Sequence, residues 1–176
     1  MTSFIIKAHE GRAIPEQWKT EPDCPFCQII RDDAPAYRLY ENDQVIAFLD
    51  ILPLRPGHIL VVPKTHYSRV SELPPEFAAA VGAAVSKVAH ALTEALENTA
   101  LNVVCNQDYA QAVPHVHYHI IPAPTAADIA KSSPSKVDHR VEPLSQKEMH
   151  RLEFEARDGL DDGAARILVA KIRAHL

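Results

Sequence analysis

Short apolar segments that end at proline constrain the fold of this chain more than any other feature of its sequence. Fourteen prolines stand against five glycines. Pro63 closes the apolar run at residues 58–62, and Pro122 closes the run at residues 115–121. Because proline has no backbone N–H to give to a sheet, a strand tends to end where one occurs. The pattern predicts five short strands, at residues 37–40, 45–51, 58–62, 101–105 and 115–121.

One long helix is predicted between the third and fourth strands. Pro74 and Pro75 stand at its start, a position that tolerates proline because the first N–H groups of a helix have no partner within it. Apolar residues then recur every three or four positions, which places them on one side of a helix. They are Phe77, Val81, Val85, Val88, Leu92 and Leu96. Since short turns join most strands, we predict an α+β fold, an antiparallel five-stranded meander with one long helix and a C-terminal helical extension.

Composition divides the chain into parts. They are an N-terminal arm at residues 1–22, a domain at residues 23–124, and a linker with a helical extension at residues 125–176. Residues 123–143 hold few large apolar groups, which is typical of a mobile linker. Helical periodicity then returns, and we expect the extension to pack across a dimer or near the mouth of an active site. Its helices are predicted at about residues 146–156 and 161–175, the latter with Ile167, Leu168 and Ile172 on one side.

Charge and cysteine content limit the partners and the compartment. The chain has 18 Lys and Arg against 23 Asp and Glu, which argues against a nucleic-acid partner because such proteins usually present a basic surface. No apolar run approaches the roughly 18–20 residues that span a bilayer, so no membrane partner is expected. Residues 1–12 lack the apolar segment of a secretory signal, and three cysteines are a poor disulfide framework. We expect a cytoplasmic protein, with the nucleus as the alternative compartment.

Three histidines alternate along the last predicted strand. His115, His117 and His119 would all face one side of the sheet, because side chains alternate along a strand. Three protonated rings on one face would repel one another, so we expect neutral rings. Structural packing, metal binding and nucleophilic or acid–base chemistry all remain open from the spacing alone.

A pair of cysteines near the start of the domain has two interpretations. Cys24 and Cys27 form a CxxC motif, which serves redox chemistry when it opens a helix in a thioredoxin-like βαβ unit. The predicted antiparallel sheet is a poor match to that setting. The alternative is half of a zinc site, which needs two further ligands.

Several ordered segments resemble the histidine-triad (HIT) superfamily. Residues 111–122 resemble its signature, in which three histidines alternate with apolar residues. Residues 24–30, 48–51 and 56–66 resemble further segments of the family, in the same order. The resemblance is strongest to the Hint branch, whose members hydrolyse nucleoside phosphoramidates such as adenosine 5′-monophosphoramidate. It implies a HIT fold and a homodimer whose two sheets join into one.

The resemblance also implies catalytic roles for the three histidines. His117 takes the position of the nucleophile, which attacks the α-phosphorus and holds the nucleotidyl group until water displaces it. His119 takes the position that contacts the phosphate and assists proton transfer to the leaving group. His115 takes a supporting position, and His58 lies where the family supports the nucleophile from behind.

The remaining implied contacts concern a purine nucleotide and a metal. Asp50 matches the carboxylate that binds both ribose hydroxyls, a task that suits an acceptor with two oxygens. Asn106 and Gln111 fall near phosphate-binding positions. The apolar cleft around the base is matched by Phe26, Ile29, Phe48 and Ile51, for which ordinary core packing is the alternative. Zinc-bearing members use four ligands that are all present here, Cys24, Cys27, His66 and His115; free thiols are the alternative to this closed structural zinc site.

The loop before the histidines departs from the family pattern. Residues 106–111 are short and lack glycine, and Ala112 replaces a serine that assists the leaving group in many Hint-type members. The leading activity is a nucleoside phosphoramidase. Three alternatives remain: a dinucleoside polyphosphate hydrolase, an aprataxin-like hydrolase of adenylated DNA, and a nucleotide-binding regulatory scaffold with little turnover.

Overall fold

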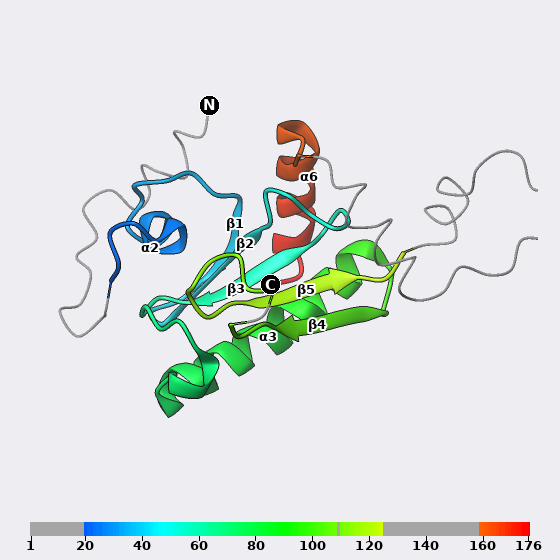
Figure 1. Ribbon diagram of the computed structural model, residues 1–176. Coiled ribbons are helices and arrows are strands. Elements are labelled where there is room, and N and C mark those ends of the chain that lie inside the picture. Colours follow the sequence, from blue (N-terminus) through cyan, green and yellow to red (C-terminus); the bar gives the residue numbers. More distant parts are fainter. Residues whose placement is uncertain (1–19, 109, 125–158) are drawn as a thin grey trace, which may run out of the picture.

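The computed structural model describes residues 20–108, 110–124 and 159–176, which form one sheet covered by helices (Figure 1). The strands are β1 (Arg38–Glu41), β2 (Val45–Leu49), β3 (Ile59–Pro63), β4 (Leu101–Cys105) and β5 (Tyr118–Pro122). The helices are α2 (Pro25–Ile30), the short 3₁₀ turn η1 (Val70–Glu72), α3 (Pro75–Leu96) and α6 (Asp162–Arg173). Among these described helices, none is both long and apolar enough to cross a membrane.

The five strands pair in the order β1-β2-β3-β5-β4, and every pair is antiparallel. The predicted α+β class with a five-stranded antiparallel sheet is therefore confirmed. The order differs from a plain meander at one point, because β5 lies between β3 and β4. The long helix α3 carries the chain across the sheet between β3 and β4, so β4 forms an edge and β5 fills the position beside β3.

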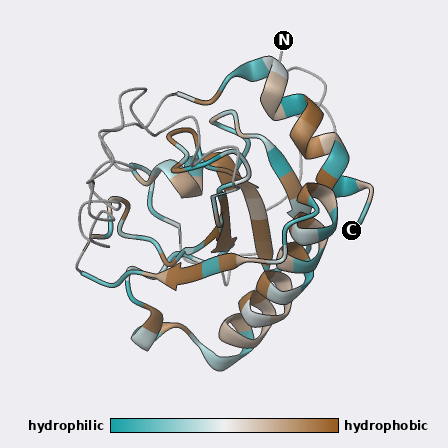
Figure 2. Cartoon of the chain, turned by 90° about the vertical axis from the view of Figure 1, so that its right-hand side faces the viewer, coloured by the Kyte–Doolittle hydropathy of each residue, from teal (hydrophilic) through white to brown (hydrophobic). Residues whose placement is uncertain are grey.

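Both faces of the central strands are buried, as the alternation of their side chains requires. Val45, Ala47 and Leu49 of β2 face α3 and belong to the main core, whereas Ile46 and Phe48 face the other side and pack near α2. The central strands are accordingly coloured as hydrophobic over most of their length in Figure 2. The apolar stripe predicted for α3 is the side that it buries, and the buried residues of this helix are Val81, Ala84, Val88, Ala91, Leu92 and Ala95.

The predicted strand at residues 115–121 begins later than expected. β5 starts at Tyr118, so His115 and His117 lie in the segment that leads into it. β3 ends at Pro63, and the N–H of Val116 donates to the main-chain oxygen of Tyr67 at 2.7 Å instead of extending the ladder. The expectation that all three histidines are strand positions was therefore wrong, because only His119 lies within β5. The rings of His115 and His117 nevertheless both contact Phe26, and the ring of His119 lies beside that of His117.

The C-terminal helix α6 packs against α3 and β1 of its own chain. Its buried residues are Ala165, Val169 and Ile172, and Asp161 caps its start by accepting from the N–H of Ala164 at 2.8 Å. Ile167 is 72% exposed, so its predicted place on the buried side was wrong; two positions from Ala165 and from Val169, it falls on the opposite side of the helix. The helix expected at residues 146–156, the linker after residue 124 and most of the N-terminal arm lie outside the described residues.

Candidate active site

His117 is 3% exposed and lies just before β5. Its Nδ1 is 2.6 Å from the main-chain oxygen of His115. Because a carbonyl oxygen can only accept, Nδ1 carries the proton of the neutral ring and Nε2 carries the lone pair. Burial lowers the pKa of His117 below its ordinary 6.5. A neutral imidazole with an unprotonated Nε2 can act as a nucleophile or as a base.

His119 stands beside His117 and is held by a second histidine. The rings of His117 and His119 have centroids 4.8 Å apart, and Nδ1 of His119 is 2.9 Å from Nε2 of His58. The N–H of Leu54 donates to Nδ1 of His58 at 3.2 Å, so the proton of His58 lies on Nε2 and is donated to His119. Neutral His119 therefore keeps its own proton on Nε2. The sequence assigned His58 to the support of the nucleophile. In the structure its direct contact is with His119, whose ring lies beside that of His117.

Asp50 and the two residues after it form a turn beside these rings. One carboxylate oxygen of Asp50 accepts from the N–H of Leu52 at 2.9 Å, and the other lies 3.5 Å from Nδ1 of His58. The N–H of Asp50 also donates to the main-chain oxygen of His58 at 3.0 Å. Ile51 and Leu52 are 67% and 51% exposed. The turn thus presents a carboxylate and two apolar side chains beside the histidines, a combination that suits a polar ligand with one flat apolar part.

The four residues expected around a base divide into two kinds. Phe26 and Phe48 are buried in the core cluster between α2 and the sheet, with ring centroids 5.6 Å apart. The ring of Phe26 also meets that of His117 edge to face, at a centroid distance of 5.1 Å. Ile29 is half-buried and Ile51 is exposed. The structure therefore places Phe26 and Phe48 in the core beside His117, packs half-buried Ile29 against the same cluster, and leaves Ile51 exposed on the turn after Asp50.

The short loop before the histidines is held by side-chain amides. The side chain of Gln111 donates to the main-chain oxygen of Ser68 at 2.8 Å and accepts from the N–H of Asp108 at 3.0 Å. Asn106 is half-buried at the start of the loop. Ala110 has φ +54°, in the left-handed region that glycine adopts most readily. Ala110 thus takes a conformation for which the family pattern would supply a glycine, and Gln111 is committed to the shape of the loop.

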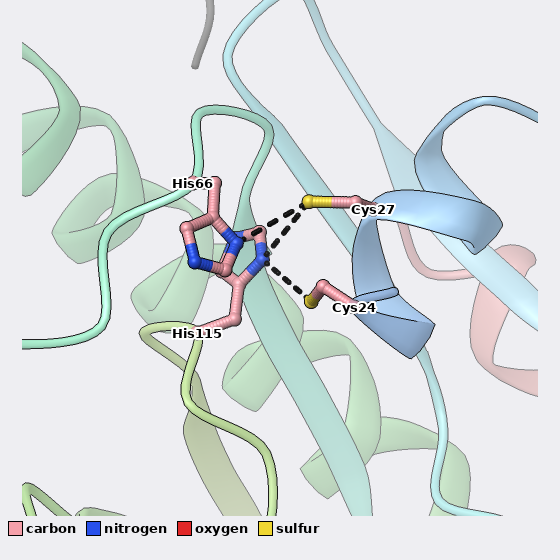
Figure 3. A group of neighbouring side chains, drawn as sticks. All are labelled: Cys24, Cys27, His66 and His115. Carbon is pink, nitrogen blue, oxygen red and sulfur yellow. Dashed lines mark hydrogen bonds between the residues drawn. The ribbon is translucent and has the colours of Figure 1, made fainter. Parts of the chain in front are cut away.

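A second group of side chains brings together the four residues that the sequence assigned to zinc (Figure 3). The two cysteines come from the start of α2, His66 follows β3, and His115 precedes β5. Their ligand atoms, two sulfurs and two Nδ1 atoms, all lie within 4.8 Å of one another.

The distances within this group fit a tetrahedral metal. The sulfur of Cys24 is 3.5 Å from Nδ1 of His115, and the sulfur of Cys27 is 3.3 Å from Nδ1 of His66 and 3.7 Å from that of His115. A tetrahedral zinc with ordinary bond lengths places sulfur and nitrogen ligands about 3.6 Å apart. The donor set of two thiols and two imidazoles is also one that zinc prefers.

Protons in the group are arranged in a way that favours a metal. Nε2 of His115 donates to the main-chain oxygen of Pro63 at 2.9 Å, so Nδ1 has a lone pair that faces the sulfurs. The hydrogen bond from Cys27 lowers the pKa of Cys24 to about 3 against the effect of burial, and the same bond raises the pKa of Cys27. Thiols and imidazoles bind a metal in their unprotonated forms, and the lowered pKa of Cys24 and the lone pair of His115 both suit that requirement.

Two buried charges near the site were missed by the sequence analysis. Arg38 is 5% exposed and binds the carboxylate of Asp32 and the main-chain oxygen of Ile29. Lys64 is 2% exposed and donates to Glu41 at 2.5 Å. Buried charges need such partners because desolvation is expensive. The sequence gives no sign of this burial, because a lone basic residue in a strand of mixed residues usually faces solvent.

The part of the chain that carries His58, His117 and His119, residues 31–125, matches the HIT domain. The chain belongs to the HIT domain family. This HIT-domain protein is 40% identical over 102 residues to the adenylylsulfatase HINT3 of Arabidopsis thaliana, a match that covers 57% of this chain and 52% of that relative. It is 42% identical over 103 residues to the adenosine 5′-monophosphoramidase hnt1 of Schizosaccharomyces pombe, covering 57% of this chain and 74% of the relative. The chain thus spans about half the length of HINT3.

Solved structures agree with this assignment. A HIT-like protein involved in cell-cycle regulation from Bartonella henselae superimposes with a TM-score of 0.66 and 29% identity, covering 89% of this chain and 98% of that one. A zinc-bound histidine triad protein from Mycobacterium smegmatis superimposes with a TM-score of 0.60 and 31% identity, covering 86% and 94%. The HIT fold expected from the sequence is confirmed.

Proposed function

We propose that this HIT-domain protein is a nucleotide hydrolase that attacks the α-phosphate of an AMP conjugate, with AMP-amines as the leading substrates. The observation that carries the proposal is the hydrogen bond from Nδ1 of His117 to the oxygen of His115, which leaves a buried Nε2 with a lone pair beside His119. The names of two relatives support the substrate class. One is an adenylylsulfatase and the other an adenosine 5′-monophosphoramidase, so their substrates share the adenylyl group and differ in the leaving group.

The proposed reaction has two steps. Nε2 of His117 attacks the α-phosphorus and the bond from phosphorus to the amine breaks. The departing nitrogen takes the Nε2 proton of His119, which enters this step as an imidazolium and leaves it as a neutral ring. A nucleotidyl-histidine remains. Water then attacks the same phosphorus and gives its proton to His119, and the bond from phosphorus to His117 breaks to release AMP. His58 holds the ring of His119 through its Nδ1, which keeps Nε2 toward the reaction, and His115 orients His117.

The nucleotide is proposed to lie across the turn that carries Asp50. Two carboxylate oxygens can accept from two ribose hydroxyls, and the accessible apolar side chains of Ile29 and Ile51 provide surface for a purine. Phe26 and Phe48 support this surface from the core. Asn106 and Gln111 are proposed to lie near the phosphate. Gln111 acts there by shaping the loop, because its amide is bonded within it.

We also propose a structural zinc held by Cys24, Cys27, His66 and His115. When bound, a metal with four protein ligands has no open position, so it supplies no Lewis-acid chemistry and serves to fix the chain. The ligands join α2 to the segment before β5, so this cluster holds the main-chain oxygen of His115 where His117 needs it. The zinc-bound relative from Mycobacterium smegmatis supports this proposal.

The assembly and compartment remain proposals as well. We propose a homodimer in which two copies pair through the edge strand β4, where Val103 is 45% exposed. An exposed apolar edge strand is a ready template for pairing with a second sheet. The three-part division at residues 22 and 124, and a location in the cytoplasm or nucleus, are proposed from the sequence. Sedimentation equilibrium of the full chain tests the dimer.

A substrate panel tests the proposed function. The full chain is incubated with an AMP-amine, adenylylsulfate, dinucleoside tri- and tetraphosphates, and adenylated DNA, and alkali-stable, acid-labile adenylyl groups on the protein are measured after rapid quenching in base. We expect fastest release from the AMP-amine and a transient adenylyl-protein that the variant H117A does not form. Preference for a dinucleoside polyphosphate or for adenylated DNA would move the assignment to one of those hydrolases. AMP that binds without turnover of any substrate would indicate a regulatory scaffold.

A further inference from the structure

The turn at Asp50, Ile51 and Leu52 is held on one side by the residues of the active site. Its first residue is tied to that side, because the N–H of Asp50 donates to the main-chain oxygen of His58 at 3.0 Å. Within the turn, the N–H of Leu52 donates to the carboxylate of Asp50 at 2.9 Å. The middle of the turn is tied elsewhere. The main-chain oxygen of Ile51 accepts from the N–H of Leu160 at 3.1 Å.

Leu160 lies just before α6, which is itself fixed to the opposite side of the sheet. The side chain of Leu160 packs against the main core, and Asp161 caps the helix. The hydroxyl of Tyr37 donates to Asp162 at the start of α6, and Arg173 at its end donates to the main-chain oxygen of Arg38 at 2.8 Å. The segment that meets Ile51 is therefore attached to β1 as well as to the core.

We propose that α6 of this chain positions the nucleotide-binding turn, acting through the hydrogen bond from Leu160 to Ile51. The inference rests on the proposed function, because it takes Asp50 and Ile51 as the residues that receive ribose and base. Leu160 is a positioning residue and touches no reacting atom. Its N–H fixes the peptide that joins Ile51 to Leu52, whose own N–H donates to the Asp50 carboxylate, so its removal lets this turn relax away from the shape that binds a nucleotide.

The expected effect is on affinity and not on the chemical step. One hydrogen bond of this kind changes an equilibrium by about threefold to tenfold. The histidines are held by other contacts, those of His115, His58 and Leu54, so the rate constant within the complex should hardly change. By linkage, a bound nucleotide should in turn favour the bond between Leu160 and Ile51.

The test compares Leu160→Pro with Leu160→Ala in the full chain. Both variants lose the leucine side chain, but only proline lacks the N–H. Binding of AMP is measured by titration calorimetry, and turnover of an AMP-amine gives kcat and KM. We expect Leu160→Pro to raise the Kd of AMP and the KM about threefold to tenfold relative to Leu160→Ala, with kcat within twofold. Equal Kd values for the two variants would overturn the inference.

Hydrogen exchange of the wild type gives a second readout that needs no folded variant. The exchange rate of the Leu160 amide is measured alone, with saturating AMP, and with inorganic phosphate as a probe of the histidine end of the site. We expect AMP to slow this exchange and phosphate to leave it unchanged. An exchange rate that AMP does not alter would overturn the inference while AMP binding itself upheld the proposed function. Failure of the wild type to bind AMP at all would overturn both.

Discussion

Two groups of potential metal ligands lie on either side of His117, and they differ in where their protons lie. The first contains Cys24, Cys27, His66 and His115, and the second contains Asp50, His58 and His119; in each group the potential ligand atoms lie within 4.8 Å of one another. Counting such residues would therefore assign a metal to both. The positions of their protons separate them.

In the first group, the ring nitrogen of His115 that faces the sulfurs is the one without a proton, because the other nitrogen donates to Pro63. In the second group, Nε2 of His58 and Nδ1 of His119 are only 2.9 Å apart, closer than the roughly 3.3 Å between two nitrogens on a tetrahedral zinc. The N–H of Leu54 also occupies the remaining nitrogen of His58. Main-chain donors and acceptors thus suit one group to a metal and the other to a chain of hydrogen bonds.

The largest effect is expected for the residue that stands between the two groups. His117→Ala should lower the rate of AMP-amine hydrolysis by at least about 1000-fold, which corresponds to about 4 kcal/mol of lost transition-state stabilisation. AMP binding should be largely kept, because Asp50 and Ile51 remain. The measurements are single-turnover rates and calorimetric Kd values, with the exposed His90→Ala on α3 as the control. Activity within about tenfold of the wild type would refute a nucleophile at this position.

Disrupting the first group should lower the stability of the fold more than the rate of the reaction. Cys24→Ser should abolish the binding of about one zinc per chain and lower Tm by at least about 5 °C, because binding energy at a structural site is also folding energy. Metal analysis and thermal unfolding of protein purified without chelator test this. The matched control is Cys105→Ser, which removes a thiol outside the group. Wild-type protein with no metal and titratable thiols at both Cys24 and Cys27 would contradict the site.

Much of the framework could be predicted from local patterns. The ends of β3 and β5 at Pro63 and Pro122 follow from the backbone chemistry of proline, and the buried stripe of α3 follows from the helical period. Both effects act within a few residues. The four metal-binding candidates were also named correctly as a group that the structure brings together. Grouping them from the sequence required the family motif, because no local pattern relates Cys24 to His115.

What could not be predicted depends on contacts between distant segments. The start of β5 is set by the bond between Val116 and Tyr67, and the partner of His58 by the pairing of β3 with β5. Ile167 is apolar and yet exposed, since the packing of α6 on α3 and β1 selects the side that carries Ala165 and Val169. Tertiary packing determines these features, and it cannot be read from a single sequence.

Breaking the second group should change chemistry with little loss of metal. His58→Phe keeps a ring but removes the hydrogen bond to Nδ1 of His119, so Nε2 of His119 is no longer held toward the leaving group. We expect AMP-amine hydrolysis to fall about 10- to 100-fold, because an amine must be protonated to leave. Adenylylsulfate should be affected less, since sulfate leaves without a proton. The two rates, measured beside zinc content, test this; an equal loss for both substrates would contradict proton donation by His119.

The smallest expected effect is the pH dependence that His117, the residue between the two groups, gives to stability and rate. Burial lowers the pKa of His117 in the folded protein below its ordinary 6.5. Above pH 6.5 the ring is neutral whether the chain is folded or unfolded, so it contributes no pH dependence. Below pH 6.5 the unfolded chain takes up a proton that the folded chain resists, so stability falls with the pH until the folded pKa is passed. The acid limb of the single-turnover rate should also lie below pH 6.5, because the nucleophile must be neutral. Urea unfolding of wild type and His117→Ala between pH 5 and pH 8 isolates this residue. A stability difference that stays constant across that range would show that His117 is not held neutral by burial.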